Sequence, residues 1–536
     1  MRSSGPAPVR GMVFFLLGAA GAAGLLCAMS PMDSIQRASL LPVTGARHAS
    51  FPPTVPGVVL ARFKDNGLDP DRIARDLSQL LAAIPTAHSS PLEEINPDTH
   101  DVTIYLDGRV PVGAAIADLK RDSSVVFAEP DGICKASFVP NDPYYDENYD
   151  SYDGPIDQWF LRTIDGPKGW DLLRKVDSQV CLAIIDTGVD YTHPDLQNVM
   201  ARNSKGDLVG RSFVPGTESS IDDHGHGTHC AGIADADTDN GIGVAGVGFQ
   251  SFRIVPAKVL NAGGAGHWDW IANAITWCAD NGCRVESMSL GGGPYSQAMQ
   301  DAINYAWSKG VIVVAAAGNS ASSAPGYPAG CNHVVAVSAT DSDDHLAKFS
   351  NFGNPIAVGA PGVKVLSTLP SYPCTINRSG RKINYDSLSG TSMACPVVAG
   401  ILASLIAYQP TLTPTDAVDR LEATADNIAK APKGGWEAQF GHGRVNLDRA
   451  LRNDRRTSSV GCFYGQVTGA GGIAVSNARV RCGSLSLTTR ADGMFRFANL
   501  KPASYSLSAT SGSRKGQVSA TIVPGVDTCI SLGVKN

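Results

Sequence analysis

Charge is scarce in this sequence. Lys, Arg, Asp and Glu make up only 18% of the 536 residues, and the formal net charge is −6. The sequence has no basic block and no interleaving of basic with aromatic residues, which are the usual signs of nucleic-acid binding. We therefore expect no nucleic-acid partner. Because 43% of the residues are hydrophobic, the composition is nonetheless that of a globular protein.

Long hydrophobic runs are also scarce, since the sequence predicts no membrane span after the N-terminal region. Residues 1–30 contain Arg2 and Arg10, an uncharged apolar run at 11–29, and small residues at its end. This pattern is typical of a secretory signal peptide, so we expect a secreted, extracellular protein. An uncleaved anchor that attaches the protein to the cell surface is the alternative, because the run has about the minimum length of a span.

Cysteine is sparse, with 12 residues in the chain. The central and the C-terminal regions each hold an odd number of them, so each has a free thiol unless a bridge joins the two regions. Cys278 with Cys283, and Cys331 with Cys374, are candidate pairs. Spacing alone does not decide whether either pair forms a disulfide.

The length predicts two to four domains. Residues 31–57 have no periodicity and are expected to be a linker. Residues 58–138 have the pattern of a small α+β domain, in which strands and helices alternate. The strands are predicted at 58–63, 102–106 and 125–127, and the helices at 71–83 and 112–119.

Residues 139–452 predict an α/β domain. Continuous apolar strands alternate with helices, which is typical of a parallel sheet covered on both faces, a three-layer architecture. The predicted strands are 181–185, 285–290, 311–317 and 334–339, and one of the helices is 268–281. Residues 453–460 are polar and are expected to be a linker. Residues 461–536 have short alternating strands and turns, which predict a small β-sandwich.

Three short segments contain residues suited to nucleophilic catalysis. Asp186 ends an apolar strand, His226 lies in the run His-Gly-His-Gly-Thr-His, and Ser392 lies in Ser-Gly-Thr-Ser-Met-Ala. Each segment alone has an ordinary explanation, such as a helix cap, a metal site or the start of a helix. A serine hydroxyl is a weak nucleophile that needs an adjacent base, and the base needs a group that orients it.

Together these segments resemble the signatures of the subtilisin-like serine proteases, in that family's order Asp, His, Ser. Segments 189–196, 288–292 and 315–319 are also family-like, so the resemblance covers about 140–452. It implies a serine endopeptidase that forms an acyl-enzyme, with Asp186, His226 and Ser392 as the catalytic triad. It also implies an oxyanion hole formed by the Asn319 amide and the backbone N–H of Ser392.

Other readings of the same residues remain. A metal site of His224, His226 and His229 lacks the helical histidine pair and the glutamate of a zinc protease motif. A protease-fold binding protein without catalysis would be expected to lack part of the triad, and all of it is present. A surface adhesion protein, in which the C-terminal region carries the function, is a third possibility.

The resemblance also implies where a peptide substrate binds. It would lie as an added strand between 264–266 and 289–291. Gly326 is expected at the floor of the first specificity pocket, and no carboxylate lies nearby, so we expect a preference for large apolar residues before the scissile bond. Trp268 and Ile271 are expected to shape a second pocket. The predicted substrate-binding residues are Gly264, Gly266, Trp268, Ile271, Ser289, Leu290, Gly291, Gly318 and Gly326.

A structural Ca²⁺ site is expected from resemblance to part of the family. Its predicted ligands are the side chains of Asp142, Asp195 and Asn240 and the backbone carbonyls of Ile242 and Val244. Carboxylate, amide and carbonyl oxygens suit this hard cation. A solvated acidic loop is the alternative. Asp222 and Asp223, beside the histidine run, are expected to be surface charges.

The flanking domains have resemblances of their own. Residues 58–138 resemble the family's propeptides, which act as intramolecular inhibitors, and we expect cleavage between Cys134 and Asn141. Residues 461–536 resemble the transthyretin-like regulatory module found beside carboxypeptidases, with Asp492-Gly493 as a hairpin turn. We expect this module to be a binding or stabilising appendage, and the protein to be a monomer that acts on protein or peptide substrates.

Overall fold

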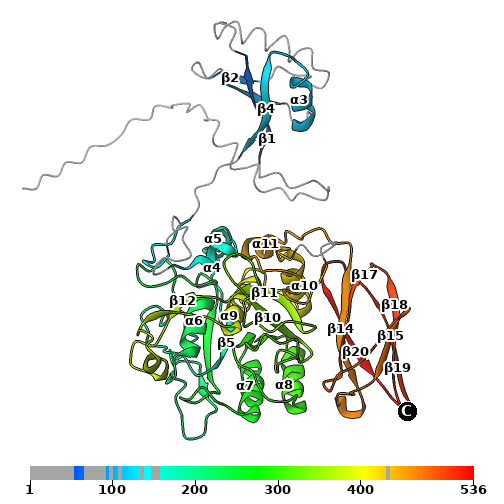
Figure 1. Ribbon diagram of the computed structural model, residues 1–536. Helices are drawn as coiled ribbons and strands as arrows, with labels where there is room; N and C mark the ends of the chain where they lie inside the picture. Colours follow the sequence, from blue (N-terminus) through cyan, green and yellow to red (C-terminus); the bar gives the residue numbers. More distant parts are fainter. Residues whose placement is uncertain are drawn as a thin grey trace, which may run out of the picture. The chain divides into compact units, whose positions relative to one another are not determined.

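The computed structural model describes residues 54–64, 92–95, 101–106, 111–132, 138–145, 157–429 and 435–536 of the chain. The chain forms two compact units, Met1–Lys135 and Ala136–Asn536 (Figure 1). The predicted signal peptide at 1–30 and the predicted helix at 71–83 lie outside the described residues.

The described part of the first unit is an antiparallel sheet with a helix. The sheet has the strand order β2-β3-β1-β4. Its strands are β1 (Thr54–Phe63), β2 (Leu92–Ile95), β3 (Asp101–Tyr105) and β4 (Val125–Gly132), and the helix is α3 (Val112–Leu119). Val59, Ile104 and Leu119 are buried together between the sheet and the helix. The sheet starts at Thr54, so strand structure begins inside the predicted linker.

A parallel seven-stranded sheet forms the centre of the second unit, as the apolar strands predict. Its strand order is β11-β10-β9-β8-β5-β7-β6. The strands are β5 (Cys181–Asp186), β6 (Arg211–Ser212), β7 (Arg253–Lys258), β8 (Cys283–Met288), β9 (Ile312–Ala316), β10 (Val334–Thr340) and β11 (Ile356–Pro361). The α/β fold class is thereby confirmed.

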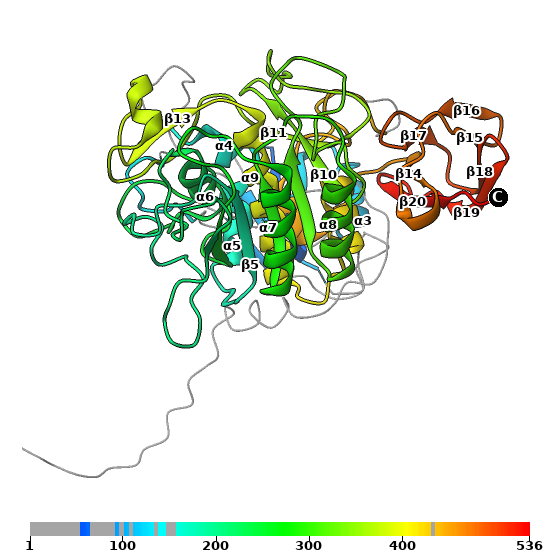
Figure 2. The ribbon, with the colours of Figure 1, turned by 90° about the horizontal axis from the view of Figure 1, so that it is seen from below.

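Helices cover both faces of this sheet, and successive side chains of one strand therefore enter different cores. Leu182 and Ile184 belong to one buried cluster, and Ala183 and Ile185 to the other. The helices of the first cluster include α6 (His226–Asp235) and α9 (Thr391–Tyr408), and those of the second are α7 (Trp268–Asp280) and α8 (Gln297–Ser308). Figure 2 shows α7 and α8 side by side.

The remaining elements of this domain lie around the sheet. They are α4 (Trp159–Thr163), α5 (Gly166–Leu173), α10 (Pro414–Thr424), α11 (Leu447–Arg452), the β12–β13 hairpin (Val365–Thr368 with Tyr385–Leu388) and the 3₁₀ turn η2 (Thr375–Ser379). Among the described helices, α9 alone is as long and apolar as a membrane span, but 89% of its apolar stretch is buried inside the protein. We therefore assign α9 as the central core helix of a globular domain.

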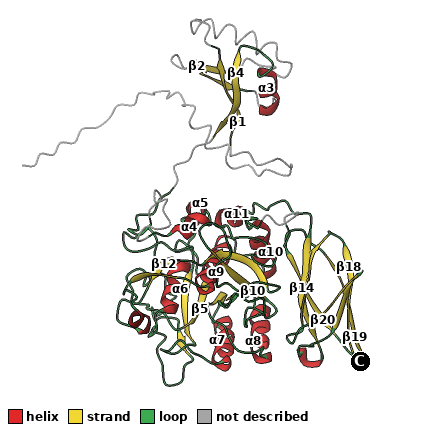
Figure 3. Ribbon diagram, viewed as in Figure 1, coloured by secondary structure: helices red, strands yellow, loops and turns green. Residues whose placement is uncertain are grey.

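The C-terminal region consists of strands, apart from one short helical turn, and belongs to the second unit (Figure 3). Two sheets, β17-β14-β20 and β16-β15-β18-β19, enclose an apolar core that includes Phe463, Phe497 and Leu507. The elements are β14 (Gly461–Thr468), η4 (Ala470–Gly472), β15 (Arg479–Cys482), β16 (Leu485–Thr488), β17 (Met494–Leu500), β18 (Ser504–Ser511), β19 (Arg514–Thr521) and β20 (Asp527–Gly533). This is the predicted β-sandwich.

The cysteines of the described residues are free thiols. Neither candidate pair, Cys278 with Cys283 or Cys331 with Cys374, is bridged in this structure.

Candidate active site

A cleft of about 970 Å³ opens where several strands of the central sheet end. Asp186 is the last residue of β5, and Ser289 and Ala317 follow β8 and β9 closely. Because these strands are parallel, the loops at their carboxyl ends meet at one edge of the sheet, where α/β proteins commonly bind ligands. His226, Ser392 and Asn319 all line this cleft.

Asp186 and His226 form a hydrogen-bonded pair, with 2.8 Å between Asp186 Oδ1 and His226 Nδ1. His226 is the first residue of α6, and that helix approaches the loop after β5 so closely that a Cβ at Gly227 would lie 2.1 Å from the Gly188 carbonyl oxygen. Only glycine fits there. Burial lowers the pKa of His226, but the charge and hydrogen bond of Asp186 outweigh it and raise the pKa above 6.5. The pair therefore stabilises the imidazolium that would form when neutral His226 accepts a proton.

Ser392 lies in the first turn of α9, at the same cleft. Its hydroxyl donates a hydrogen bond to the Ser289 carbonyl at 3.1 Å, and the Ser289 hydroxyl donates to the Ser392 carbonyl at 2.7 Å. These two bonds join the start of α9 to the segment after β8. The serine–histidine hydrogen bond of a triad often forms only when substrate is bound.

Asn319 has its amide orientation fixed by Thr391. Its Oδ1 accepts hydrogen bonds from the Thr391 backbone N–H and the Thr391 hydroxyl, both at 2.9 Å. The amide NH₂ remains as the donor. It lies next to Gly390, where a Cβ would be 3.4 Å from Asn319 Nδ2. A fixed amide donor beside a nucleophilic serine can stabilise an oxyanion.

Asp222 is not the surface charge that we expect from the sequence. Its side chain is fully buried and accepts five hydrogen bonds, four from the segment 224–228 around His226 and one from the loop after β5. The donors are the Thr187 hydroxyl, the backbone N–H groups of His224, Gly225 and Thr228, and the Thr228 hydroxyl. Asp222 followed by His224-Gly225 is a sequence typical of a side-chain-to-backbone turn, which could have indicated this role.

Lys258, at the end of β7, is a second buried charge that the sequence analysis missed. Its Nζ donates to Asp223 Oδ1 at 2.6 Å and to the backbone carbonyls of Thr187 and Leu260 at 2.6 and 2.9 Å. Asp223 therefore forms an ion pair at the surface of the loop. A lysine directly after the apolar run 254–257 was the available sequence sign.

His229 does not support a histidine metal site. Its Nε2 bonds to the Asp386 backbone carbonyl at 3.1 Å, and burial lowers the pKa of His229 to about 3. It is therefore a neutral, structural histidine that anchors α6 to the β12–β13 hairpin.

Every residue that we predict to bind substrate lines the cleft. A Cβ at Gly326 would lie 3.1 Å from the Ala317 carbonyl oxygen, and one at Gly264 would lie 3.1 Å from His224 Nε2. The walls of the cleft thus depend on residues without side chains. The predicted set is Gly264, Gly266, Trp268, Ile271, Ser289, Leu290, Gly291, Gly318 and Gly326.

Three of the predicted calcium ligands, the side chains of Asp142, Asp195 and Asn240, lie near one another in a part of the domain that does not line the cleft. Asn240 Nδ2 and the Val244 N–H donate to Asp195 at 2.8 Å, and the Asp239 N–H donates to Asp142 Oδ2 at 2.8 Å. The other oxygen of Asp142 is buried without a hydrogen-bond partner. Burial raises the pKa of Asp142 to about 6 and that of Asp195 to about 7.

These carboxylates fit a cation. Two neighbouring buried carboxylates repel each other, and within the described ranges no lysine or arginine forms a salt bridge to either. A hard cation bound between them would remove the repulsion between the carboxylates and would supply the positive charge that they lack. The Asn240 amide oxygen accepts from the Ile242 N–H at 2.8 Å, and an amide oxygen has a second lone pair with which it could bind a cation.

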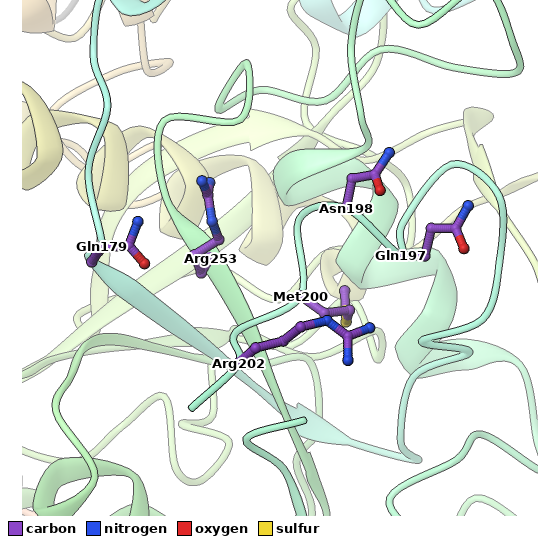
Figure 4. A pocket seen from close by; sticks show the side chains of 6 residues that line it. All are labelled: Gln179, Gln197, Asn198, Met200, Arg202 and Arg253. Atoms are coloured by element: carbon purple, nitrogen blue, oxygen red, sulfur yellow. The ribbon is translucent and has the colours of Figure 1, made fainter. Parts of the chain in front are cut away.

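A smaller pocket of about 360 Å³ lies apart from the cleft (Figure 4). It is lined by Gln179, Gln197, Asn198, Met200, Arg202 and Arg253. The two guanidinium groups point in different directions in Figure 4, and Arg253 already donates to the carbonyls of Gln250 and Phe252. The pocket has no nucleophile and no converging charges.

Comparisons with known proteins agree with this geometry. The model of the Subtilase family matches residues 177–443. Thermitase of Thermoactinomyces vulgaris is 39% identical over 315 residues, which is 59% of this chain and 100% of thermitase. The chain belongs to the subtilase family. A thermophilic serine proteinase of a Bacillus species is also 39% identical, over 63% of this chain and 76% of that protein.

This subtilase is a serine endopeptidase. A solved structure supports its fold. The crystal structure of fervidolysin from Fervidobacterium pennivorans, a keratinolytic enzyme related to subtilisin, aligns with a TM-score of 0.54 at 24% identity, over 90% of this chain and 78% of that one.

Proposed function

We propose that this subtilase cuts peptide bonds with Asp186, His226 and Ser392 as its triad. His226 takes the proton of the Ser392 hydroxyl as Oγ attacks the carbonyl carbon, and then gives it to the leaving amine, so that an acyl-enzyme remains. Water hydrolyses this ester with the same base. The Asp186–His226 hydrogen bond of 2.8 Å, in one cleft with Ser392, is the observation that carries the proposal.

Asn319 and the Ser392 backbone N–H would stabilise the tetrahedral intermediate. The Thr391 bonds leave only the NH₂ side of the Asn319 amide as a donor. Loss of one such donor typically costs about 3–4 kcal/mol of transition-state stabilisation. Ser392, at the start of α9, also lies where backbone N–H groups are unpaired and favour negative charge.

The lining of the cleft supports a preference for large apolar residues before the scissile bond. Gly326, Ala316 and Ala317 line it without adding bulk or charge. The segments 264–266 and 289–291 both line the cleft, and an extended peptide would add as a strand between them. Trp268 and Ile271 would contact the substrate further from the cut.

We propose that the protein is synthesised as a secreted precursor and matures by removal of its propeptide. Residues 1–30 would direct export, 58–138 would inhibit the protease until it is cleaved, and 139–452 would be the mature catalytic domain. The boundary between the compact units, at Lys135–Ala136, lies inside the predicted cleavage interval and supports this division. Ca²⁺ held by Asp142, Asp195 and the 240–244 loop would stabilise the mature enzyme.

Ser392→Ala tests the central proposal. We expect a folded precursor that keeps its propeptide, because the same triad would cut near residue 138. Gel analysis and N-terminal sequencing of purified protein, with no other protease present, would show this. Normal maturation of Ser392→Ala would refute self-processing, and residual peptide hydrolysis at the wild-type rate would refute the triad.

A further inference from the structure

The C-terminal sandwich contacts the loop that carries Gly326. The hydroxyl of Tyr327, the next residue, donates a hydrogen bond to Asp492 Oδ2 at 2.7 Å. Asp492 precedes β17 and is fully buried, and Tyr327 is 8% exposed. A hydrogen bond to a carboxylate that is shielded from water is stronger than one at the surface. The sandwich therefore holds the cleft loop by a buried, charge-assisted bond.

The sandwich itself fixes the position of the Asp492 carboxylate. Asp492 Oδ1 accepts from the Met494 N–H at 2.9 Å, and Oδ2 accepts from Arg490 Nη2 at 3.1 Å. Gln466 Nε2 donates to the Asp492 backbone carbonyl at 2.8 Å. Asp492 is thus a preorganised acceptor. Its carboxylate is already fixed by the sandwich, so little conformational freedom of Asp492 is lost when the Tyr327 hydroxyl bonds to it.

The backbone of Tyr327 is bonded to the predicted substrate-binding segment at 289–291 through the next residue, Gly292. The Gly292 N–H donates to the Tyr327 carbonyl at 3.1 Å, and a Cβ at Gly291 would lie 3.1 Å from that oxygen. The Tyr295 ring packs edge-on against the Tyr327 ring, with 5.5 Å between centroids. The segment 326–328 is therefore held between the substrate side of the cleft and the sandwich.

A second group of contacts joins the sandwich to the catalytic domain elsewhere. Arg496 Nε donates to the Asn354 carbonyl at 2.8 Å, and its guanidinium lies 4.5 Å from the centre of the Trp436 ring. Asn499 makes two bonds to the Trp436 backbone, at 3.0 Å each. Among the described residues that line the cleft, none belongs to this second group. It joins the domains without touching the cleft.

We propose that Asp492 is a positioning residue of the protease. Through Tyr327 it fixes the segment 326–328 and so sets the shape of the pocket for the side chain before the scissile bond. The C-terminal module would then be part of the substrate-selecting apparatus. This inference rests on the assignment of Gly326 to that pocket in the proposed function.

Three variants test the link. Tyr327→Phe removes only the donor oxygen, Asp492→Ala removes the acceptor, and Asp492→Asn keeps an acceptor oxygen. The readout is kcat and KM for matched peptides with Phe or Ala before the cut, with active enzyme counted by an irreversible serine inhibitor. We expect Tyr327→Phe and Asp492→Ala each to lower the Phe-over-Ala ratio of kcat/KM by about fivefold or more, mainly through KM.

The double variant should lower that ratio no more than either single variant, because one bond cannot be lost twice. Asp492→Asn should lower the ratio less than Asp492→Ala does, because it keeps one acceptor oxygen but loses the charge and the second acceptor. Asn499→Ala, in the second group of contacts, is the matched control and should lower thermal stability while leaving the ratio unchanged. The proposal is overturned if Tyr327→Phe leaves the ratio unchanged, or if Asn499→Ala changes it equally.

Gly326→Asp tests the pocket assignment separately. An unpaired carboxylate there should weaken cleavage after Phe and favour cleavage after Lys or Arg by at least about tenfold in relative kcat/KM. An unchanged Phe-to-Lys ratio in Gly326→Asp would refute the pocket of the proposed function, whatever the Asp492 variants do. Cleavage of Ala peptides by the Asp492 variants shows that their catalytic centre is intact.

Discussion

At the scale of single residues, His226 shows how one neighbour sets the chemistry of another. Burial alone would lower the pKa of this imidazole, and the Asp186 carboxylate at 2.8 Å, with a smaller contribution from the charge of Asp222, raises it above 6.5. The position of Asp186 at the end of an apolar strand was visible in the sequence. The balance between burial and charge was not, because it depends on distances that only the fold establishes.

The pH dependence of kcat/KM should report the pKa of His226, which burial lowers and the charge of Asp186 raises. His226 acts as a base only when neutral, so activity should fall as the pH drops through its raised pKa, above the 6.5 of an ordinary histidine. In Asp186→Asn the charge that raises the pKa is gone, so the acid limb should move to lower pH. The rate should also drop by about 10⁴-fold, because the tautomer is no longer fixed.

The control is Asp207→Asn, an exposed carboxylate of the same domain, which should leave the whole profile in place. An acid limb that stays where it is in Asp186→Asn would contradict the assignment of His226 as the base that Asp186 tunes.

At the scale of elements, the sequence predicted the strands and helices better than the loops between them. The apolar run before Asp186 appears as β5, and the predicted helix at 112–119 appears as α3. Periodicity and burial determine such elements. Asp222 was misjudged because its five donors come from backbone and side chains that only tertiary packing collects.

Asp222 should therefore matter for the loop that carries His226. Asp222→Ala leaves five donors without their acceptor, several of them buried, and each unsatisfied buried group costs about 1–3 kcal/mol. We expect a clear loss of thermal stability and a lower kcat, since His226 loses its support. Glu218→Ala, an exposed carboxylate in the same loop, is the matched control and should change neither. Wild-type melting temperature and kcat in Asp222→Ala would contradict this role.

At the scale of the whole molecule, the contacts that matter most join residues far apart in the sequence. Tyr327 and Asp492 are 165 residues apart, and nothing in either local sequence indicates that they meet. The β-sandwich itself was predicted from its turns and short strands, but its docking was not, because docking depends on the surface of another domain. The proposed triad could be put forward from the sequence because each of its residues lies in a distinctive short segment.

Calcium is the proposed link between the start of the mature chain and its core. Asp142 lies near the expected mature N-terminus, while Asp195 and the 240–244 loop belong to the domain body. Without a cation, two buried carboxylates remain close together; burial raises the pKa of both, and the charge of Asp142 raises that of Asp195 further. A ligand that binds only the folded state adds about 2.7 kcal/mol of stability at a hundredfold excess over its Kd.

Excess chelator should therefore lower the Tm of the mature enzyme, and added Ca²⁺ should restore it. Asp195→Ala should have a low Tm already and respond little to either, since it lacks a central carboxylate of the site. Asp343→Ala is the matched control, because Asp343 belongs to an exposed cluster with Asp341 and His345 that could attract cations only weakly. That variant should respond to chelator like the wild type. An unchanged wild-type Tm in excess chelator would contradict the proposed calcium site at Asp142 and Asp195. If Asp343→Ala loses the response instead of Asp195→Ala, the cation binds at the exposed cluster.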